Sequence, residues 1–302
     1  MRLGLYHSCF LSWDLEKLFS WMAQQGMKDV ELHGGPRYSQ VDWRAIAKGR
    51  TGGLPHLTEK YDIQIIDIMY GGFPFLDPDP QRREQAVEGA MTLLAAARHL
   101  DIPSVSVFTG RDPLLSIEQN LDRMEDVFPR LLDFAAQQDV SILLENCPMS
   151  QDWPPSHNIA FSPLIWQEIF ERFDSAYFGL NFDPSHLVWQ DIDYLSAAWE
   201  FRDRISLVQA KDSLRLPHVQ RRAGILDGRF WEHRIPGRGE VDWNRLTTTL
   251  MASGYGGPLI IEHEDPYSSG SVEATERGVF ATMMHLQPLL DAELPRLSEG
   301  NA

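Results

Sequence analysis

The stretch Phe178-Gly-Leu-Asn-Phe-Asp-Pro-Ser-His-Leu-Val-Trp189 decides both the fold and the place of a site. A short apolar run, typical of a strand buried on both faces, ends at Asp183, and Pro184 stops it. His186 follows three residues after the acid. A strand that delivers a carboxylate at its C-terminal end, with an imidazole one turn later, is a common beginning of a ligand site. The sequence therefore predicts a fold that brings further oxygen donors to Asp183.

Strand-like and helix-like segments alternate along the whole chain on both sides of this stretch. The predicted strands are 3–6, 29–32, 63–69, 104–108, 141–145, 177–183, 205–211 and 258–262. The predicted helices are 13–25, 42–60, 77–100, 116–138, 163–173, 194–201, 243–253 and 271–290. This alternation predicts an α/β fold, a single (β/α)8 TIM barrel over residues 1–302, with a doubly wound open sheet as the alternative.

Residues 212–242 form the longest stretch without periodicity. Long connections in compact domains are usually functional or disordered, and on a barrel this one follows the seventh strand at the catalytic face. We interpret it as a partial lid or substrate wall, and a solvated surface excursion is the alternative. It is rich in arginine, aromatic residues and glycine: Arg215, Arg221, Arg222, Gly228, Arg229, Phe230, Trp231, Arg234, Gly237, Arg238 and Gly239.

The bulk composition narrows the class of function. The chain of 302 residues has 43 acidic and 27 basic residues, a formal charge of 27 − 43 = −16, which repels a phosphate backbone and disfavours nucleic-acid binding. Cys9 and Cys147 form no Cys-x-x-Cys pair, so zinc-ribbon and thioredoxin-like sites are not predicted. The start of the chain does not resemble a signal peptide, and no apolar run reaches the roughly 18 residues of a membrane span. A cytoplasmic protein without a membrane partner is expected.

Four predicted strands carry an oxygen donor at or near their C-terminal ends: Glu145, Asp183, Gln209 and Glu262. Each alone fits a solvated strand end or a helix cap. Together they indicate a site, because the C-terminal ends of barrel strands open into one common space. Such an oxygen-only shell suits a hard divalent ion, and we expect Mn²⁺, with Mg²⁺ or Co²⁺ as alternatives.

The whole chain resembles the xylose isomerase-like barrel family, the sugar isomerases and epimerases related to D-tagatose and D-psicose 3-epimerases. The resemblance rests on the order and spacing of five pieces: Leu-Leu-Glu145-Asn-Cys-Pro, Asn-Phe-Asp183-Pro-Ser-His186-Leu, Val-Gln209-Ala-Lys211-Asp212, Ile235-Pro-Gly-Arg-Gly-Glu240-Val-Asp-Trp243 and Ile-Ile-Glu262-His-Glu.

This resemblance implies roles for the same residues. The family's matching acids place Glu145, Asp183 and Glu262 on a divalent metal, together with a histidine from the seventh strand. It also makes Glu145 and Glu262 the acid/base pair on opposite faces of a sugar, and His186 and Arg215 contacts to the substrate.

The chain departs from the family at two positions. Gln209 stands where most relatives have a metal-binding histidine, and a glutamine carbonyl oxygen is a harder, weaker and neutral ligand. We therefore expect a preference for Mn²⁺ or Mg²⁺ over zinc, or looser binding, and loss of the metal is the alternative. Gln151 stands where the 3-epimerases tend to have another glutamate, so the substrate is left open.

Further residues are expected near the mouth of the barrel. His7, after the first strand, and Glu31 and His33, around the end of the second, are predicted to face it, with His7 either a substrate contact or an ordinary packing residue. Cys147 has no evident general base in the sequence and is not predicted to be a nucleophile. Four aromatic residues in strand-to-helix loops are candidates for walls against which a sugar ring stacks, with simple core packing as the alternative: Trp13, Phe73, Trp153 and Trp189.

The predicted activity is that of a divalent-metal-dependent sugar or cyclitol epimerase or isomerase. A metal polarises the substrate carbonyl, one glutamate removes the neighbouring carbon-bound proton, and a metal-bound enediolate accepts a proton from the other face or at the adjacent carbon. The first alternative is a lyase or dehydratase that acts on a keto-inositol or a 3-keto-glycoside from the same site. A DNA-repair endonuclease and a non-catalytic sugar-binding barrel are less favoured. Relatives are often dimers or tetramers, which leaves a homo-oligomer open.

Overall fold

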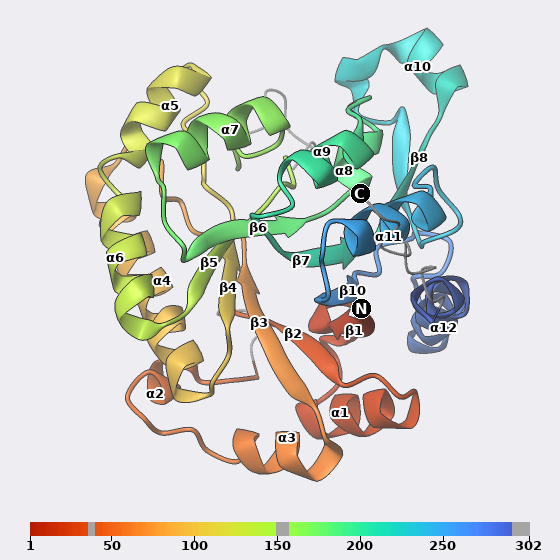
Figure 1. Ribbon diagram of the computed structural model, residues 1–302, viewed down its shortest axis with the longest axis horizontal. Coiled ribbons are helices and arrows are strands. Elements are labelled where there is room, and N and C mark those ends of the chain that lie inside the picture. Colours follow the sequence, from red (N-terminus) through yellow and green to blue (C-terminus); the bar gives the residue numbers. More distant parts are fainter. Residues whose placement is uncertain (36–39, 149–156, 292–302) are drawn as a thin grey trace, which may run out of the picture.

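The computed structural model is a closed barrel of eight parallel strands surrounded by helices, and it describes residues 1–35, 40–148 and 157–291 (Figure 1). The barrel strands are β1 (Arg2–Tyr6), β2 (Asp29–His33), β3 (Gln64–Tyr70), β4 (Ser104–Val107), β5 (Ser141–Glu145), β6 (Phe178–Phe182), β7 (Ile205–Ala210) and β10 (Pro258–Ile261). Neighbours in sequence pair in order, and β10 pairs with β1 to close the ring. The predicted (β/α)8 barrel is confirmed, and the open sheet is excluded.

The helices lie outside the strands and form the outer layer (Figure 1). They are α1 (Leu15–Gln24), α2 (Trp43–Ile46), α3 (Leu54–Tyr61), α4 (Pro80–His99), α5 (Ile117–Met124), α6 (Phe128–Gln138), α7 (Pro163–Arg172), α8 (Ser185–Val188), α9 (Tyr194–Glu200), α10 (Pro217–Ala223), α11 (Trp243–Ala252) and α12 (Val272–Leu290). The chain also has two short 3₁₀ turns, η1 (His7–Phe10) and η2 (Ile225–Asp227). No helix in the described part of the chain is long and apolar enough to cross a membrane.

Two predicted helices were wrong in their extent. The helix predicted at 42–60 is two helices, α2 and α3, because Gly49 and Gly52 take left-handed backbone angles between them. The helix predicted at 116–138 is also two, α5 and α6, and Pro129 stands in the first turn of α6, where its missing N–H costs nothing. In both cases an amphipathic pattern continued across a break in the backbone.

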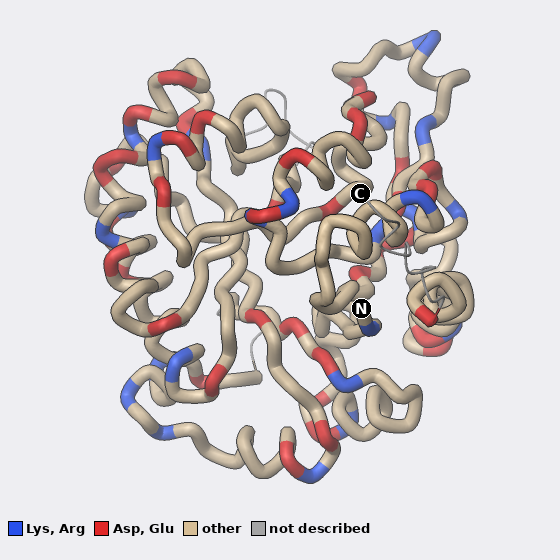
Figure 2. Tube along the Cα trace, viewed as in Figure 1, with Lys and Arg blue, Asp and Glu red and all other residues tan. Residues whose placement is uncertain are grey.

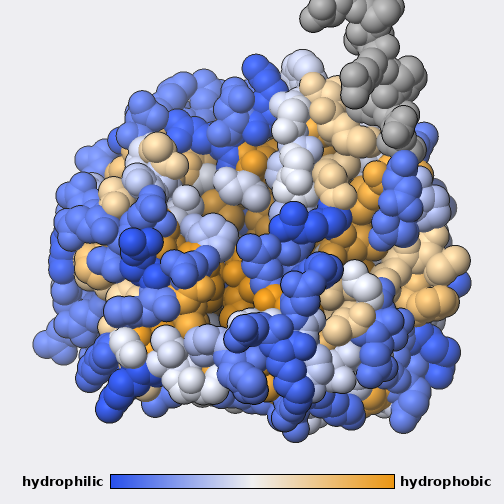
Figure 3. Space-filling view, turned by 60° about the horizontal axis from the view of Figure 1, so that its bottom comes forward, coloured by the Kyte–Doolittle hydropathy of each residue, from blue (hydrophilic) through white to orange (hydrophobic). Residues whose placement is uncertain are grey.

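The buried apolar residues form two clusters. The larger cluster fills the space between the strands and the helices, and its fully buried side chains include Trp166, Trp243 and Phe128. A smaller cluster of buried residues is made by the strands and the residues just after them: Tyr6, Ile66, Met69, Phe108, Leu143, Cys147, Leu207 and Ile260. Positions of charged residues are distributed over the outer helices (Figure 2). In the space-filling view, hydrophobic residues show in the hollowed middle of a largely hydrophilic face (Figure 3).

Residues 212–242 are more regular than their sequence indicates. β8 (Asp212–Arg215) and β9 (Trp231–Arg234) pair as an antiparallel hairpin, and α10 and η2 lie between them. The sequence of this segment shows no hydrophobic periodicity because its strands are short and only partly buried. The base of the hairpin is held by the buried carboxylate of Asp212, which accepts backbone N–H groups from Ser213 at 2.8 Å and Val241 at 3.0 Å.

Gly239 is the position where this base leaves no room for a side chain. A Cβ at Gly239 would overlap the Asp212 carboxylate and the Ser213 carbonyl oxygen. Gly239→Ala is therefore expected to lower the free energy of unfolding by about 1–3 kcal/mol, because overpacking forces neighbouring groups to move. The measurement is urea unfolding, with Gly256→Ala as the matched control, since no atom lies within 4 Å of a Cβ there. Equal midpoints for the two variants would contradict the prediction.

Candidate active site at the carboxyl ends of the strands

Three buried carboxylates meet where β5, β6 and β10 end. Glu145 is the last residue of β5, and Asp183 and Glu262 directly follow β6 and β10. Their nearest carboxylate oxygens all lie within 4.8 Å of one another. The parallel strands thus bring together acids that are far apart in the sequence, as the sequence-based prediction required.

The Lys211 side chain is buried among these acids. Its ammonium group lies 3.0 Å from Asp183 Oδ2, 2.8 Å from Glu262 Oε2 and 3.2 Å from Glu264 Oε2. Burial lowers the pKa of Lys211, but the surrounding carboxylates outweigh it and leave that pKa well above its ordinary value. The same ammonium holds the pKa of Glu264 at about 2. One fixed cation therefore balances part of the negative charge at the mouth of the barrel.

The two glutamates proposed as acid and base are both shifted toward the protonated form. Burial raises the pKa of Glu145 well above its ordinary value, and the negative charge of Glu262 adds to this. Burial also raises the pKa of Glu262, to about 7, although Lys211 opposes the shift. Titration near neutral pH is what a group that both accepts and donates protons requires.

The pKa of Glu262 has a consequence for the stability of the metal-free protein. The folded protein binds this proton more tightly than the unfolded chain does, so ionisation of Glu262 opposes folding. Its contribution is fully present below pH 4.5, the ordinary pKa, and is lost as the pH rises to about 7, at about 1.4 kcal/mol per unit of pKa difference. In urea unfolding with a chelator, Glu262→Gln is expected to lose less stability than the wild type between pH 4.5 and 7. Parallel pH profiles would contradict this.

Gln209 is hydrogen-bonded to an acid that does not belong to the cluster of Glu145, Asp183 and Glu262. Its Nε2 donates to Glu31 Oε2 at 2.7 Å, and Asn181 Nδ2 donates to Glu31 Oε1 at 3.0 Å. Glu31 therefore lies inside the barrel in a polar network of its own, which also includes Asp67. Burial raises the pKa of both acids, that of Asp67 to about 6.

Several buried oxygen atoms at this end of the barrel are suited to a cation. Gln209 Oε1 is buried and accepts no hydrogen bond from the described residues, and the buried Asp183 Oδ2 lies 3.0 Å from the Lys211 ammonium. Carboxylate and amide oxygens are the donors that hard divalent ions prefer. The three carboxylates thus lie close enough together to share one divalent ion, and Gln209 as a fourth ligand stays a prediction.

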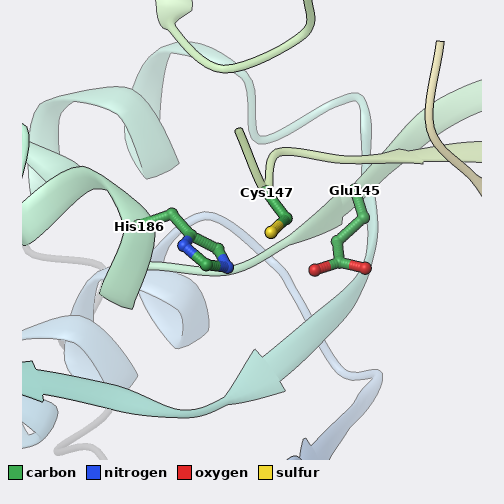
Figure 4. A group of neighbouring side chains, drawn as sticks. All are labelled: Glu145, Cys147 and His186. Atoms are coloured by element: carbon green, nitrogen blue, oxygen red, sulfur yellow. The ribbon is translucent and has the colours of Figure 1, made fainter. Parts of the chain in front are cut away.

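Nitrogen and sulfur donors stand beside the acids. Figure 4 shows the Cys147 sulfur and the His186 ring directed toward the Glu145 carboxylate. One donor atom from each of these three residues lies within 4.8 Å of the other two. Burial lowers the pKa of His186 well below its ordinary value, and Lys211 contributes, so the ring is neutral.

The other predicted substrate contacts lie in three different environments. His7 is buried, accepts the His33 backbone N–H at 3.3 Å through Nδ1, and has a pKa lowered to about 4 by burial. Trp13 is packed in the core, where its ring stacks on Phe10 with centroids 4.3 Å apart. Arg215 is paired with Asp191 at 2.7 Å and Glu240 at 2.8 Å. Gln151 and Trp153 lie outside the described residues.

A cavity of about 1030 Å³ opens above the carboxylates. Among the residues predicted as substrate contacts, its described walls include His186 and not His7, Trp13 or Arg215. One wall comes from residues 212–242, where Trp231 of β9 stacks on Trp189 with centroids 4.8 Å apart and an interplanar angle of 6°. A second hollow of about 930 Å³, between α2 and α4, contains none of the strand-end acids.

Comparison with known proteins assigns this architecture to a family. The model of the xylose isomerase-like TIM barrel matches residues 19–287. The chain belongs to that family. The resemblance seen in the five sequence pieces is thereby confirmed, and the family contains epimerases, isomerases and dehydratases of small molecules.

Individual members of the xylose isomerase-like family are only distantly similar. An inosose dehydratase of Lacticaseibacillus casei is 31% identical over 103 residues, which span 32% of this chain and about a third (34%) of the relative. The solved 3-keto-D-glucoside 4-epimerase YcjR from E. coli has a TM-score of 0.69 at 15% identity, with 97% of this chain and 100% of that chain covered. The IOLI protein, solved with a zinc atom, has a TM-score of 0.72 at 16% identity and the same coverage.

Reasoning from the sequence missed part of the cavity wall. Glu264 was given no role beside Glu262, although alternation along the chain places residues two apart on the same side. The ion pairs of Lys211 with three acids were not anticipated either, because a lysine after a strand usually reaches solvent. Trp231 was named only as one of the aromatic residues of 212–242, and His233 of the same segment was not singled out.

Proposed function

We propose that this chain is a divalent-metal-dependent enzyme that epimerises or isomerises a sugar or a cyclitol by moving a proton at a carbon next to a carbonyl group. The observation that carries the proposal is the pair of buried glutamates, Glu145 and Glu262, with Asp183 between them in sequence and beside both in space. The two glutamates line a cavity with room for a sugar-sized substrate.

Glu145, Asp183 and Glu262 would hold the ion, with Gln209 Oε1 as a further donor. When bound, a divalent ion polarises a substrate carbonyl and so acidifies the neighbouring C–H bond.

The residues of this chain then divide the proton transfers. One glutamate, as carboxylate, takes the carbon-bound proton, and the other, as carboxylic acid, returns a proton from the opposite face. The pKa of about 7 at Glu262 leaves both forms populated at neutral pH. The Lys211 ammonium pairs with Asp183 and Glu262 and so lowers the free energy of the ionised Glu262 side chain. His186, at the cavity wall, is placed to contact substrate oxygens.

A dehydratase is the second candidate, because the local match to inosose dehydratases covers about a third of the chain. Such an enzyme would share the first proton transfer and then expel a hydroxyl group from the next carbon. The glutamate that returns a proton in an epimerase would instead protonate the leaving hydroxyl group.

The deciding experiment follows ketoses and inososes in deuterated water with Mn²⁺ or Co²⁺, by NMR and mass spectrometry. An epimerase or isomerase incorporates deuterium at the carbon next to the carbonyl without loss of mass, whereas a dehydratase loses water. Removing the metal with a chelator is expected to abolish exchange, and returning it is expected to restore exchange. If the protein binds no divalent ion in a calorimetric titration, the proposal is wrong.

A further inference from the structure

Two overlapping sets of donor atoms lie at the mouth of the barrel, and they share Glu145. One set consists of oxygen alone, from Glu145, Asp183 and Glu262. The other is mixed and adds the Cys147 sulfur and a His186 ring nitrogen to Glu145 (Figure 4). An ion bound at one set is not in the same electrostatic surroundings as an ion bound at the other.

The Lys211 ammonium forms direct ion pairs with residues of the oxygen-only set. It lies 3.0 Å from Asp183 Oδ2 and 2.8 Å from Glu262 Oε2, so it already occupies the oxygen-only side. An ion that bound both of those oxygens would lie close to this buried positive charge, and like charges repel strongly where water is excluded. The charge of Lys211 also acts on Glu145 and His186, although its ion pairs are with Asp183, Glu262 and Glu264. An ion at the oxygen-only set would have to replace two of these direct ion pairs, whereas the Cys147 and His186 donors of the mixed set form none of them.

His186 gives independent support for the mixed set. Its Nε2 is buried and makes no hydrogen bond with the described residues, although it lies 3.1 Å from Asp183 Oδ2. A separation of this size is common between two donors that share one metal ion. Binding through Nε2 requires the ring proton on Nδ1, which would give up only the long 3.4 Å contact from Trp189 Nε1.

Gln209 helps to explain why the ion would need other donors. Its amide nitrogen donates to Glu31, which holds the side chain toward the barrel interior. A neutral amide oxygen held in this way is a weak donor, so a shell without imidazole from β7 gains most from Cys147 and His186.

We propose that Cys147 and His186 join Glu145 in binding the ion, and that the site therefore prefers a borderline-soft ion such as Zn²⁺ or Co²⁺ to Mn²⁺ or Mg²⁺. This inference rests on the proposed function, which requires a divalent ion at this mouth. It replaces the oxygen-only shell expected from the sequence with one that contains a thiolate, the donor that selects zinc over hard cations. His186 is then a ligand as well as part of the cavity wall.

The test is the absorption spectrum of the full-length protein loaded with one equivalent of Co²⁺. A thiolate bound to Co²⁺ gives a charge-transfer band in the near ultraviolet that oxygen ligands do not give. The wild type and Cys9→Ser are expected to show the band, and Cys147→Ser is expected to lack it. Cys9 is the matched control because its Sγ contacts the Tyr6 carbonyl oxygen and belongs to neither donor set.

Metal affinities provide the second measurement. Competition with a chromophoric chelator is expected to show Zn²⁺ binding weakened by more than about 100-fold in Cys147→Ser, since loss of partners outside the first shell alone costs 10–100-fold. Mn²⁺ binding is expected to change little in the same variant.

The outcomes separate this inference from the proposed function. If wild-type protein binds Co²⁺ without a thiolate band, Cys147 is not a ligand and the inference is wrong, whereas the proposed function stands. If wild-type protein binds no divalent ion, both are wrong. The wild-type spectrum decides the question even if Cys147→Ser fails to fold.

Discussion

Glu262→Gln is expected to lower kcat for metal-dependent epimerisation by about 10³- to 10⁴-fold, near the upper end of what one positioned acid or base contributes. The glutamine amide keeps the size of the side chain but neither takes nor returns a proton. The Glu262 carboxylate lies 2.8 Å from Lys211 and faces the cavity, so its loss removes a group from the reacting face without opening a void. Rates are measured at saturating metal, because the same substitution weakens the ion site.

The comparison with Glu145→Gln makes the test specific for two opposed bases. In the proposed mechanism each epimer loses its carbon-bound proton to a different glutamate, so each single variant should still exchange the proton of one epimer with deuterated water while it fails to convert that epimer into the other. The matched control is Glu168→Gln, an exposed glutamate on α7, which is expected to leave both rates unchanged. Full epimerisation in either active-site variant would contradict the assignment.

The barrel was predictable because its signal is repeated along the chain. Apolar strands such as β3 and β6, each followed by an amphipathic helix, leave few alternatives to parallel pairing. The cluster of Glu145, Asp183 and Glu262 followed from the same rule, since a barrel gathers its strand ends. What failed were local breaks, such as Gly49 and Gly52 between α2 and α3, where the apolar pattern ran on through a turn.

The directions in which individual side chains point were harder to predict from the sequence. Alternation places Gln209 and Lys211 on one face of the predicted strand 205–211, yet only the packed barrel shows that the Gln209 amide donates to Glu31 and that Lys211 reaches three acids. Both contacts join residues far apart in sequence, and side-chain rotamers decide them. Trp13 shows the opposite case, because an aromatic residue in a loop after a strand fits a cavity wall and the core equally well, and here the core contains it.

Lys211→Met is expected to lower the free energy of unfolding of the metal-free protein by about 3–5 kcal/mol at pH 7, the usual cost of removing one partner of a buried ion pair. Methionine fills a similar volume, so the loss reflects charge: Asp183 and Glu262 are left buried with no cation beside them. Lys28→Met is the matched control, because Lys28 pairs with Asp62 at the surface, where such pairs contribute below about 1 kcal/mol. Urea unfolding with a chelator gives both values, and equal losses would contradict the prediction.

The pH dependence of that loss distinguishes charge from packing. In the wild type Lys211 holds the pKa of Glu264 at about 2, below its ordinary value of 4.5, so this contribution is present above pH 4.5 and is lost as the pH falls toward 2. The difference between the wild type and Lys211→Met should therefore shrink over that range, as the acids become protonated in both proteins. A loss due to packing alone would not change with pH. A divalent ion should also raise the urea midpoint of Lys211→Met more than that of the wild type, since the ion supplies the positive charge that the variant lacks and no longer meets the ammonium group.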